Sequence, residues 1–185
     1  MRLTPNRLAL PLLAAIALPS LALAQAKPPA NPTAQATLLG QYGDWGAYTA
    51  SPGGQKVCFA LAKPTSSVDN PPNRRTAANP VYIFVSTRPA EKVTNEVSVL
   101  VTGYQFKPNS EATVTVAGSN FPMYTQNDGA WVKNAAEEAK MLDTMRKGAD
   151  VVIKATTSRG TQTTDTFSLK GIGQAVDRAS QECKG

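Results

Sequence analysis

The chain of 185 residues contains no histidine. This absence excludes Ser-His and Cys-His nucleophilic pairs, zinc sites with histidine ligands, and the side chain that usually carries protons near neutral pH. An enzyme with this sequence would have to use paired carboxylates, a Ser-Lys arrangement or a bound cofactor. The nearest candidate, Ser168-Leu169-Lys170, lacks the Ser-x-x-Lys spacing. We therefore expect no cofactor, no metal site and no catalytic residues.

Clustered positive charge is also lacking. The formal net charge is +6, but Arg2 and Arg7 contribute two of these charges and the other basic residues are scattered. The one concentrated basic spot, Arg74-Arg75, lies in a stretch rich in Pro and Asn, and we interpret it as part of a solvated loop. Since nucleic-acid-binding domains carry a basic patch or stripe, we do not expect nucleic acid as a partner.

Long apolar runs are missing except at the N-terminus. Arg2 and Arg7 precede an apolar run over residues 8–21, and Ala22-Leu23-Ala24 supplies the small residues of a signal-peptidase site. The run is shorter than the roughly 20 residues that a bilayer span needs. We predict a signal peptide over residues 1–24, no transmembrane segment after its removal, and a protein located in the periplasm or at the cell surface.

Cysteine is scarce: Cys58 and Cys183 are the only two. In an exported chain, a single intramolecular disulfide between them is the first interpretation. Because the closed loop is long, the chain-entropy model gives such a bond a stabilisation of about 5 kcal/mol. A metal site made of two isolated thiols is a much weaker interpretation, and no Cys-x-x-Cys redox motif is present.

The rest of the chain has the pattern of an all-β domain. Residues 25–40 are rich in Pro, Ala and Gln and have no period, so we predict a flexible linker ahead of one domain over residues 41–185. Residues 63–80, which are rich in proline, form a predicted long loop and a candidate contact surface. Turn residues recur elsewhere between alternating segments, as in a β-sandwich or barrel. The predicted strands cover residues 45–49, 55–62, 80–88, 91–104, 112–116, 121–125, 130–133, 149–156 and 161–169.

Two helices interrupt this pattern. Asn134 is placed to cap the first helix and Gly148 to end it, with acidic residues in the first turn and basic residues in the last. Its predicted buried stripe consists of Ala135, Ala139, Leu142 and Met145. The second is a short C-terminal helix, in which Ile172, Val176, Ala179 and Cys183 fall on one face.

Several segments resemble the invasion-associated locus B family of exported bacterial proteins. The most specific is the segment over residues 158–171, SRGTQTTDTFSLKG; others are Gly43-Asp44-Trp45, Asn95-Glu96-Val97-Ser98 and Asp128-Gly129-Ala130-Trp131-Val132. The resemblance runs from about Trp45 to Cys183. It implies an immunoglobulin-like β-sandwich, a periplasmic or surface-associated location and a non-enzymatic role. The family is named for host-cell invasion, but similar proteins occur in free-living bacteria, so invasion is not assigned on this ground.

A few polar and aromatic residues have both a functional and a structural interpretation. Arg159 and Asp165, with the threonines between them, could form a binding face, but we favour a solvated edge that prevents edge pairing. Trp131 could stack on a ligand, but we favour a core position for it and for Trp45. For Glu96 we favour a cross-strand ion pair over a carboxylate pair.

The main hypothesis is a non-enzymatic binding or interaction protein of the bacterial envelope. Its partner would be an envelope or host protein, a glycan or a lipid. The candidate contact surface consists of Arg74, Arg75, Arg159 and Asp165. Two alternatives remain open. One is an envelope hydrolase or transferase that uses carboxylates, with Glu96, Glu111, Asp128 and Asp165 as candidates, and the other is a structural stabiliser of envelope proteins.

Overall fold

The computed structural model describes residues 35–184. This part of the chain forms eleven β-strands and two α-helices, with 3₁₀ turns at Pro52–Gly54 and Pro89–Glu91. The predicted signal peptide, residues 1–24, and residues 25–34 of the predicted linker lie outside the described residues. The strands are β1 (Thr37–Tyr42), β2 (Trp45–Ala50), β3 (Val57–Ala62), β4 (Ser66–Asn70), β5 (Val81–Arg88), β6 (Val93–Val101), β7 (Glu111–Val116), β8 (Ser119–Gln126), β9 (Gly129–Val132), β10 (Asp150–Thr156) and β11 (Gln162–Ser168), and the helices are α1 (Ala135–Lys147) and α2 (Ile172–Glu182).

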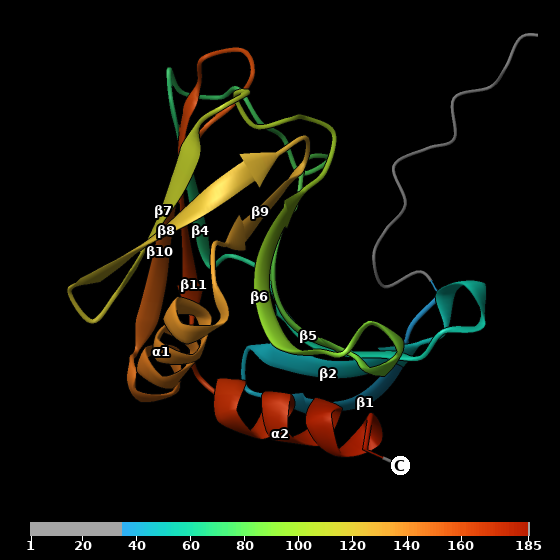
Figure 1. The fold of residues 1–185 in the computed structure, drawn as a ribbon. Coiled ribbons are helices and arrows are strands. Elements are labelled where there is room, and N and C mark those ends of the chain that lie inside the picture. The colour runs from blue at the N-terminus through green and yellow to red at the C-terminus, as the bar shows by residue number, and fades with distance from the viewer. Residues whose placement is uncertain (1–34, 185) are drawn as a thin grey trace, which may run out of the picture.

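All eleven strands belong to one antiparallel sheet, in the order β1-β2-β3-β5-β6-β9-β8-β7-β10-β11-β4. β5 and β6 curve strongly. As a result β1 and β2 lie at the bottom of the view in Figure 1, next to α2, and β7, β8, β10 and β11 lie at the left. The predicted all-β class with two helices is confirmed. An immunoglobulin-like sandwich has two separate sheets, whereas here all the strands belong to a single bent sheet. The finer, immunoglobulin-like part stays a prediction.

The two errors in the predicted strands lie at the two edges of the sheet. Residues 63–80 are not all loop, because β4 lies within them and pairs with β11. The predicted linker ends earlier than residue 40, because Thr37–Tyr42 pairs with β2 as β1. Neither edge strand alternates apolar and polar residues. Pairing with a partner distant in sequence therefore decides their structure, as happens when tertiary context overrides local propensity.

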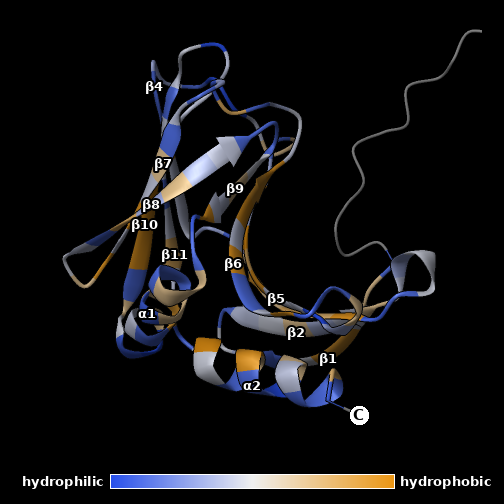
Figure 2. Cartoon of the chain, viewed as in Figure 1, coloured by the Kyte–Doolittle hydropathy of each residue, from blue (hydrophilic) through white to orange (hydrophobic). Residues whose placement is uncertain are grey.

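The main core lies on one face of the bent sheet. Its residues come from the strands on both sides of the bend and from the two helices. α2 contacts β1, β2 and β3, and its apolar residues face the sheet while its polar residues face outward (Figure 2). A second, smaller cluster lies on the opposite face of β3 and β5 and consists of Phe59, Leu61, Tyr82 and Phe84. Both faces of β3 are thus apolar, as predicted for a central strand. The largest fully buried side chains include Trp45, Ile83, Met123, Met141, Met145, Phe167 and Ile172.

Helix α1 has the predicted ends but a different buried stripe. The Asn134 side chain accepts a hydrogen bond from the backbone N–H of Glu137 at 2.9 Å, so the predicted N-cap is confirmed. Ala135 and Ala139 are exposed, and Met141 is buried beside Leu142 and Met145. The buried stripe thus consists of three large side chains, two of them from methionine, which is long and adaptable in a core.

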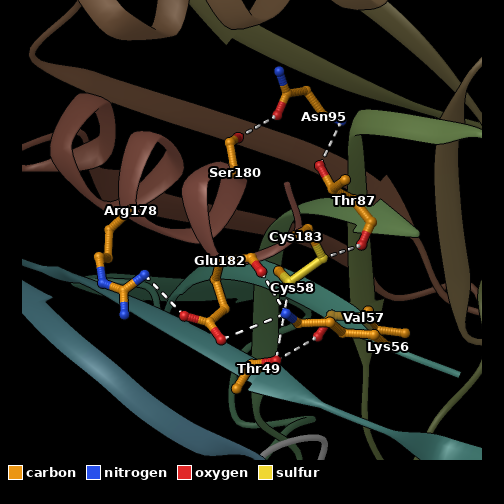
Figure 3. The surroundings of a disulfide bond; sticks show 10 residues. All are labelled: Thr49, Lys56, Val57, Cys58, Thr87, Asn95, Arg178, Ser180, Glu182 and Cys183. Atoms are coloured by element: carbon orange, nitrogen blue, oxygen red, sulfur yellow. Dashed lines mark hydrogen bonds and ion pairs between the residues drawn. A yellow bond between two sulfur atoms is a disulfide. The ribbon is translucent and has the colours of Figure 1, made fainter. Parts of the chain in front are cut away.

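The predicted disulfide joins Cys58 to Cys183, with an S–S distance of 2.01 Å and 5.8 Å between the Cα atoms. It ties the end of α2 to β3 (Figure 3). Polar contacts surround the bond: Arg178 donates to Glu182 at 3.1 Å, and the side chains of Ser180 and Asn95 are 3.2 Å apart. The C-terminal helix is therefore held to the sheet covalently, by apolar packing and by hydrogen bonds.

Candidate functional site: the arginine cleft

Three loops enclose a cleft. These loops lie at the end of the molecule opposite the two helices (Figure 1). The first loop follows β4, the second follows β6, and the third joins β10 to β11. The enclosed volume is about 580 Å³, within the range of small-molecule sites. We call it the arginine cleft, since its lining includes Arg74, Arg75 and Arg159, together with Asn79, Tyr104 and Thr161.

A buried ion network lies behind Arg75, one of the residues that line the arginine cleft. Arg75 Nε lies 2.6 Å from Asp69 Oδ1, and Arg75 Nη1 lies 2.9 Å from both carboxylate oxygens of Asp165. The side chains of Arg75, Asp69 and Asp165 are only 8%, 7% and 3% exposed. Ser67 also donates to Asp165, at 2.6 Å. Every charge in this network has a partner, as buried charges require.

The pairing of β4 with β11 places the two acids of the network. Asp69 is the register partner of Thr163, and Ser67 is the partner of Asp165, so alternate residues of the two strands point to the same side. The chain then turns back after β4. Asp69 Oδ2 accepts the backbone N–H groups of Arg74 at 3.1 Å and Arg75 at 2.7 Å, which fixes the path of this loop.

Tyr104 covers the Arg75 guanidinium. Its ring centroid lies 5.9 Å from Arg75 Cζ, and Arg75 Nη1 donates to the phenolic oxygen at 3.4 Å. Burial raises the pKa of the Tyr104 hydroxyl well above its ordinary value, although the charge of Arg75 opposes this. Burial lowers the pKa of Arg75, but its hydrogen bond to Asp165 and the charge of that carboxylate outweigh burial and raise it overall. Both groups therefore keep their protons across the physiological range.

Arg74 and Arg159 differ from Arg75 because they are exposed. Arg159 lies in a tight turn in which Gly160 has a φ of +83° and donates to the carbonyl of Thr157 at 2.9 Å. Within residues 35–184, neither the Arg74 nor the Arg159 side chain forms an ion pair, and no acidic residue lines the cleft. Two guanidinium groups are thus available to an incoming anion.

The four residues of the predicted contact surface meet at this end of the molecule, but in two different roles. Arg74 and Arg159 line the cleft from separate loops as exposed side chains, whereas Arg75 lines it as a buried side chain paired with Asp165, which lies outside the lining. The interpretation of Asp165 as part of a solvated edge is wrong, because β4 covers that edge of β11 and Asp165 is buried. Asp69 and Tyr104 were not predicted as members of the site. Asp69 lies on β4, in a segment predicted to be loop, and Tyr104 is 29 residues away from Arg75 in the sequence.

The acidic residues considered for catalysis do not come together. Arg88 on β5 donates to both oxygens of Glu96 on β6, at 3.1 and 3.0 Å, which confirms the predicted cross-strand ion pair. Glu111 pairs with Lys133, and Asp128 is exposed in the turn between β8 and β9. Among the residues that the structure describes, no group of three acids or cysteines is arranged to hold a metal ion.

The two tryptophans have different environments. Trp45 is fully buried, as predicted, and its indole N–H donates to the carbonyl of Ser168 at 2.9 Å. The predicted core position of Trp131 is wrong, because this side chain is half-buried and stacks on Tyr124, with ring centroids 5.8 Å apart. The indole lies flat over Gly129: a Cβ atom there would be 2.0 Å from Trp131 Cη2. The Gly-x-Trp spacing is the sequence signal for this arrangement.

Neither helix between residues 35 and 184 is long and apolar enough to cross a bilayer. No curated protein and no solved structure is significantly similar to the chain. The model of one protein family, described as invasion associated locus B (IalB) protein, matches residues 45–180. The matched span includes the β3 cysteine, all loops of the arginine cleft and most of α2. The chain therefore belongs to the invasion associated locus B family, as its sequence motifs indicate.

Proposed function

We propose that this protein is a non-enzymatic binding protein of the bacterial envelope that contacts its partner through the arginine cleft. The observation that carries the proposal is the convergence of Arg74 and Arg159 from loops far apart in the sequence onto one cleft. The buried network fixes the loop of Arg74 through Asp69, and hydrogen bonds between Thr157 and Thr161 close the turn of Arg159. Residues held in this way by a rigid scaffold are typical of binding sites.

The location in the periplasm or at the cell surface is part of this proposal. The disulfide supports it, since such bonds persist in oxidising compartments outside the cytoplasm. Membership of a family of exported proteins supports it as well. The absence of a role in catalysis is supported by the separate ion pairs of Glu96, Glu111 and Asp165, which leave no two of these acids facing each other.

Crosslinking followed by affinity purification from the cell envelope tests the proposal. The wild type is compared with the double variant Arg74→Glu/Arg159→Glu, and the control Lys140→Glu/Lys147→Glu makes the same charge change on exposed positions of α1. We expect the wild type and the control to recover the same partner and the cleft variant to lose it. Recovery of no partner by the wild type, or equal recovery by all three proteins, would contradict the proposal.

The same purified protein distinguishes the alternative of a carboxylate-dependent hydrolase or transferase. If turnover of an envelope polymer were found, and if Glu96→Gln, Glu111→Gln or Asp128→Asn abolished it, the non-enzymatic part of the proposal would be wrong. Asp165→Asn tests the same point only if this variant keeps the wild-type fold by circular dichroism. A purely structural role predicts instead that a deletion strain becomes detergent-sensitive and that the Arg74→Glu/Arg159→Glu protein restores resistance fully.

A further inference from the structure

We propose that the ligand of the arginine cleft is a phosphorylated saccharide, with its phosphate held between Arg74 and Arg159. This inference rests on the proposed function and names the chemistry of the group bound at that site. It follows from the charges that line the cleft, the way the two loops are fixed, and the size and polarity of the remaining walls.

The charge of the cleft wall favours an oxyanion. The two exposed guanidinium groups have no acidic neighbour in the lining, and the carboxylates of Asp69 and Asp165 lie behind Arg75, where it pairs with both. Each guanidinium presents a planar set of N–H donors, which matches phosphate oxygens in a bidentate arrangement. Two such groups on two loops of one cleft fit a dianion better than a single carboxylate.

The loops that carry these arginines are fixed before any ligand binds. Asp69 accepts hydrogen bonds from the backbone N–H groups of residues 74 and 75. In the turn at residues 157–161, the Thr157 N–H donates to the Thr161 carbonyl at 2.9 Å, and the Thr161 N–H donates to the Thr157 hydroxyl at 3.1 Å. Only the side-chain ends of Arg74 and Arg159 have to become ordered on binding. Such preorganisation reduces the entropy lost when a ligand is held.

The remaining walls suit a polyhydroxylated body. Three residues that carry hydroxyl groups, Ser158, Thr161 and Tyr104, are among those that line the cleft. Within residues 35–184 the Tyr104 hydroxyl accepts a hydrogen bond from Arg75 and donates none. The volume of about 580 Å³ exceeds what a lone phosphate fills and lies in the range of small-molecule sites. A sugar attached to the phosphate would use both the space and the hydroxyl groups.

Calorimetric titration of the purified protein tests this inference. The probes are inorganic phosphate, glucose 6-phosphate and glucose, together with vesicles of phosphatidylcholine with and without phosphatidic acid. We expect glucose 6-phosphate to bind more tightly than inorganic phosphate, glucose to show no binding, and added salt to weaken binding, since exposed charges are screened. Each of Arg74→Gln and Arg159→Gln should weaken binding about 10-fold or more, as expected for the loss of a charge-assisted hydrogen bond.

Two controls keep the result interpretable. Lys140→Gln, on α1, should bind as the wild type does, and all three variants should unfold at the wild-type temperature because each replaced side chain is exposed. No binding of either phosphate probe at millimolar concentration, or equal binding by the arginine variants, would overturn the inference. Binding to phosphatidic acid vesicles without binding of glucose 6-phosphate would overturn the saccharide and assign the phosphate to a lipid.

The failure of this inference differs from the failure of the proposed function. If crosslinking recovers a partner that depends on Arg74 and Arg159 while no phosphate probe binds, the binding function stands and the ligand chemistry is wrong. If glucose 6-phosphate binds and no partner is recovered from the envelope, the cleft chemistry is correct and the contact with a macromolecular partner is wrong.

Discussion

The two ends of the molecule each tie a late segment of the chain to an early one, but by different means. At the helical end, the disulfide joins Cys58 to Cys183 across 125 residues, and α2 adds apolar contacts. At the cleft end, β4 pairs with β11, and Arg75 joins Asp69 on β4 to Asp165 on β11 through two buried ion pairs. The disulfide uses up both thiol groups, so it leaves no polar group that could also position a binding site. An ion network of similar reach also positions neighbouring polar groups, so one structural solution can support a binding site.

The largest effect is expected from removing the covalent tie. The double variant Cys58→Ala/Cys183→Ala should lose about 5 kcal/mol of stability, because the unfolded chain regains the freedom of a closed loop of 125 residues. Urea unfolding followed by circular dichroism measures this loss, and the wild type unfolded in reductant is the control. If neither the double variant nor the reduced wild type lost stability, apolar packing of α2 alone would hold this helix to the sheet.

Breaking the ion network should have a smaller but still large effect. Asp165→Asn leaves Arg75 buried with one carboxylate fewer, and removing one partner of a buried pair costs about 3 to 5 kcal/mol. The same unfolding measurement applies. The matched control is Glu111→Gln, which breaks an exposed pair with Lys133 and should leave the transition unchanged. Equal effects of the two substitutions would contradict the structural role assigned to the network.

The smallest effect concerns a charge near the helical end, on α1. Burial raises the pKa of Glu138, and the backbone N–H of Val97, which donates to its carboxylate at 2.7 Å, only partly offsets this. Glu138 therefore binds a proton more strongly in the folded state than in the unfolded state, where its pKa is near 4.5. Stability from this site is highest at low pH and is lost as pH rises from about 4.5 through the raised pKa.

Glu138→Gln should remove this dependence. The difference in melting temperature between the variant and the wild type should shift in favour of the variant as the pH is raised from 4.5 to 7.5. Glu137→Gln, at an exposed position in the same helical turn, controls for the loss of a negative charge near the helix N-terminus. A difference that stays constant with pH would show that Glu138 is as well solvated as its neighbour.

Local chemistry predicts most of the strands and the helix ends, because alternation, turn residues and capping residues act within a few positions. The hairpin of β2 and β3, the capping by Asn134 and the face of α2 that carries Cys183 all follow from such signals. The β4 segment Ser66–Asn70 could not be predicted in this way. It has no alternating pattern, and its structure depends on pairing with β11.

The candidate site shows the same limit. Its members Arg74, Arg75, Arg159 and Asp165 were recognisable as polar residues in loops and strands, but their division into exposed and buried pairs was not. That division depends on which strand is the edge of the sheet. Because β4 is the edge strand, Asp165 on β11 is buried, and its charge is balanced by Arg75.

The position of β4 also has a consequence for synthesis and export. β4 follows β3 directly in the chain, yet its hydrogen-bonded neighbour is β11, and Ser67 and Asp165 are 98 residues apart. Cys58 and its disulfide partner Cys183 are even further apart, by 125 residues. A chain that stops before β11 is made thus carries both an unpaired sheet edge and a free thiol, features that promote aggregation and misoxidation. Truncated chains should therefore be degraded rather than accumulate, which makes completion of the last strand and helix a checkpoint for the whole molecule.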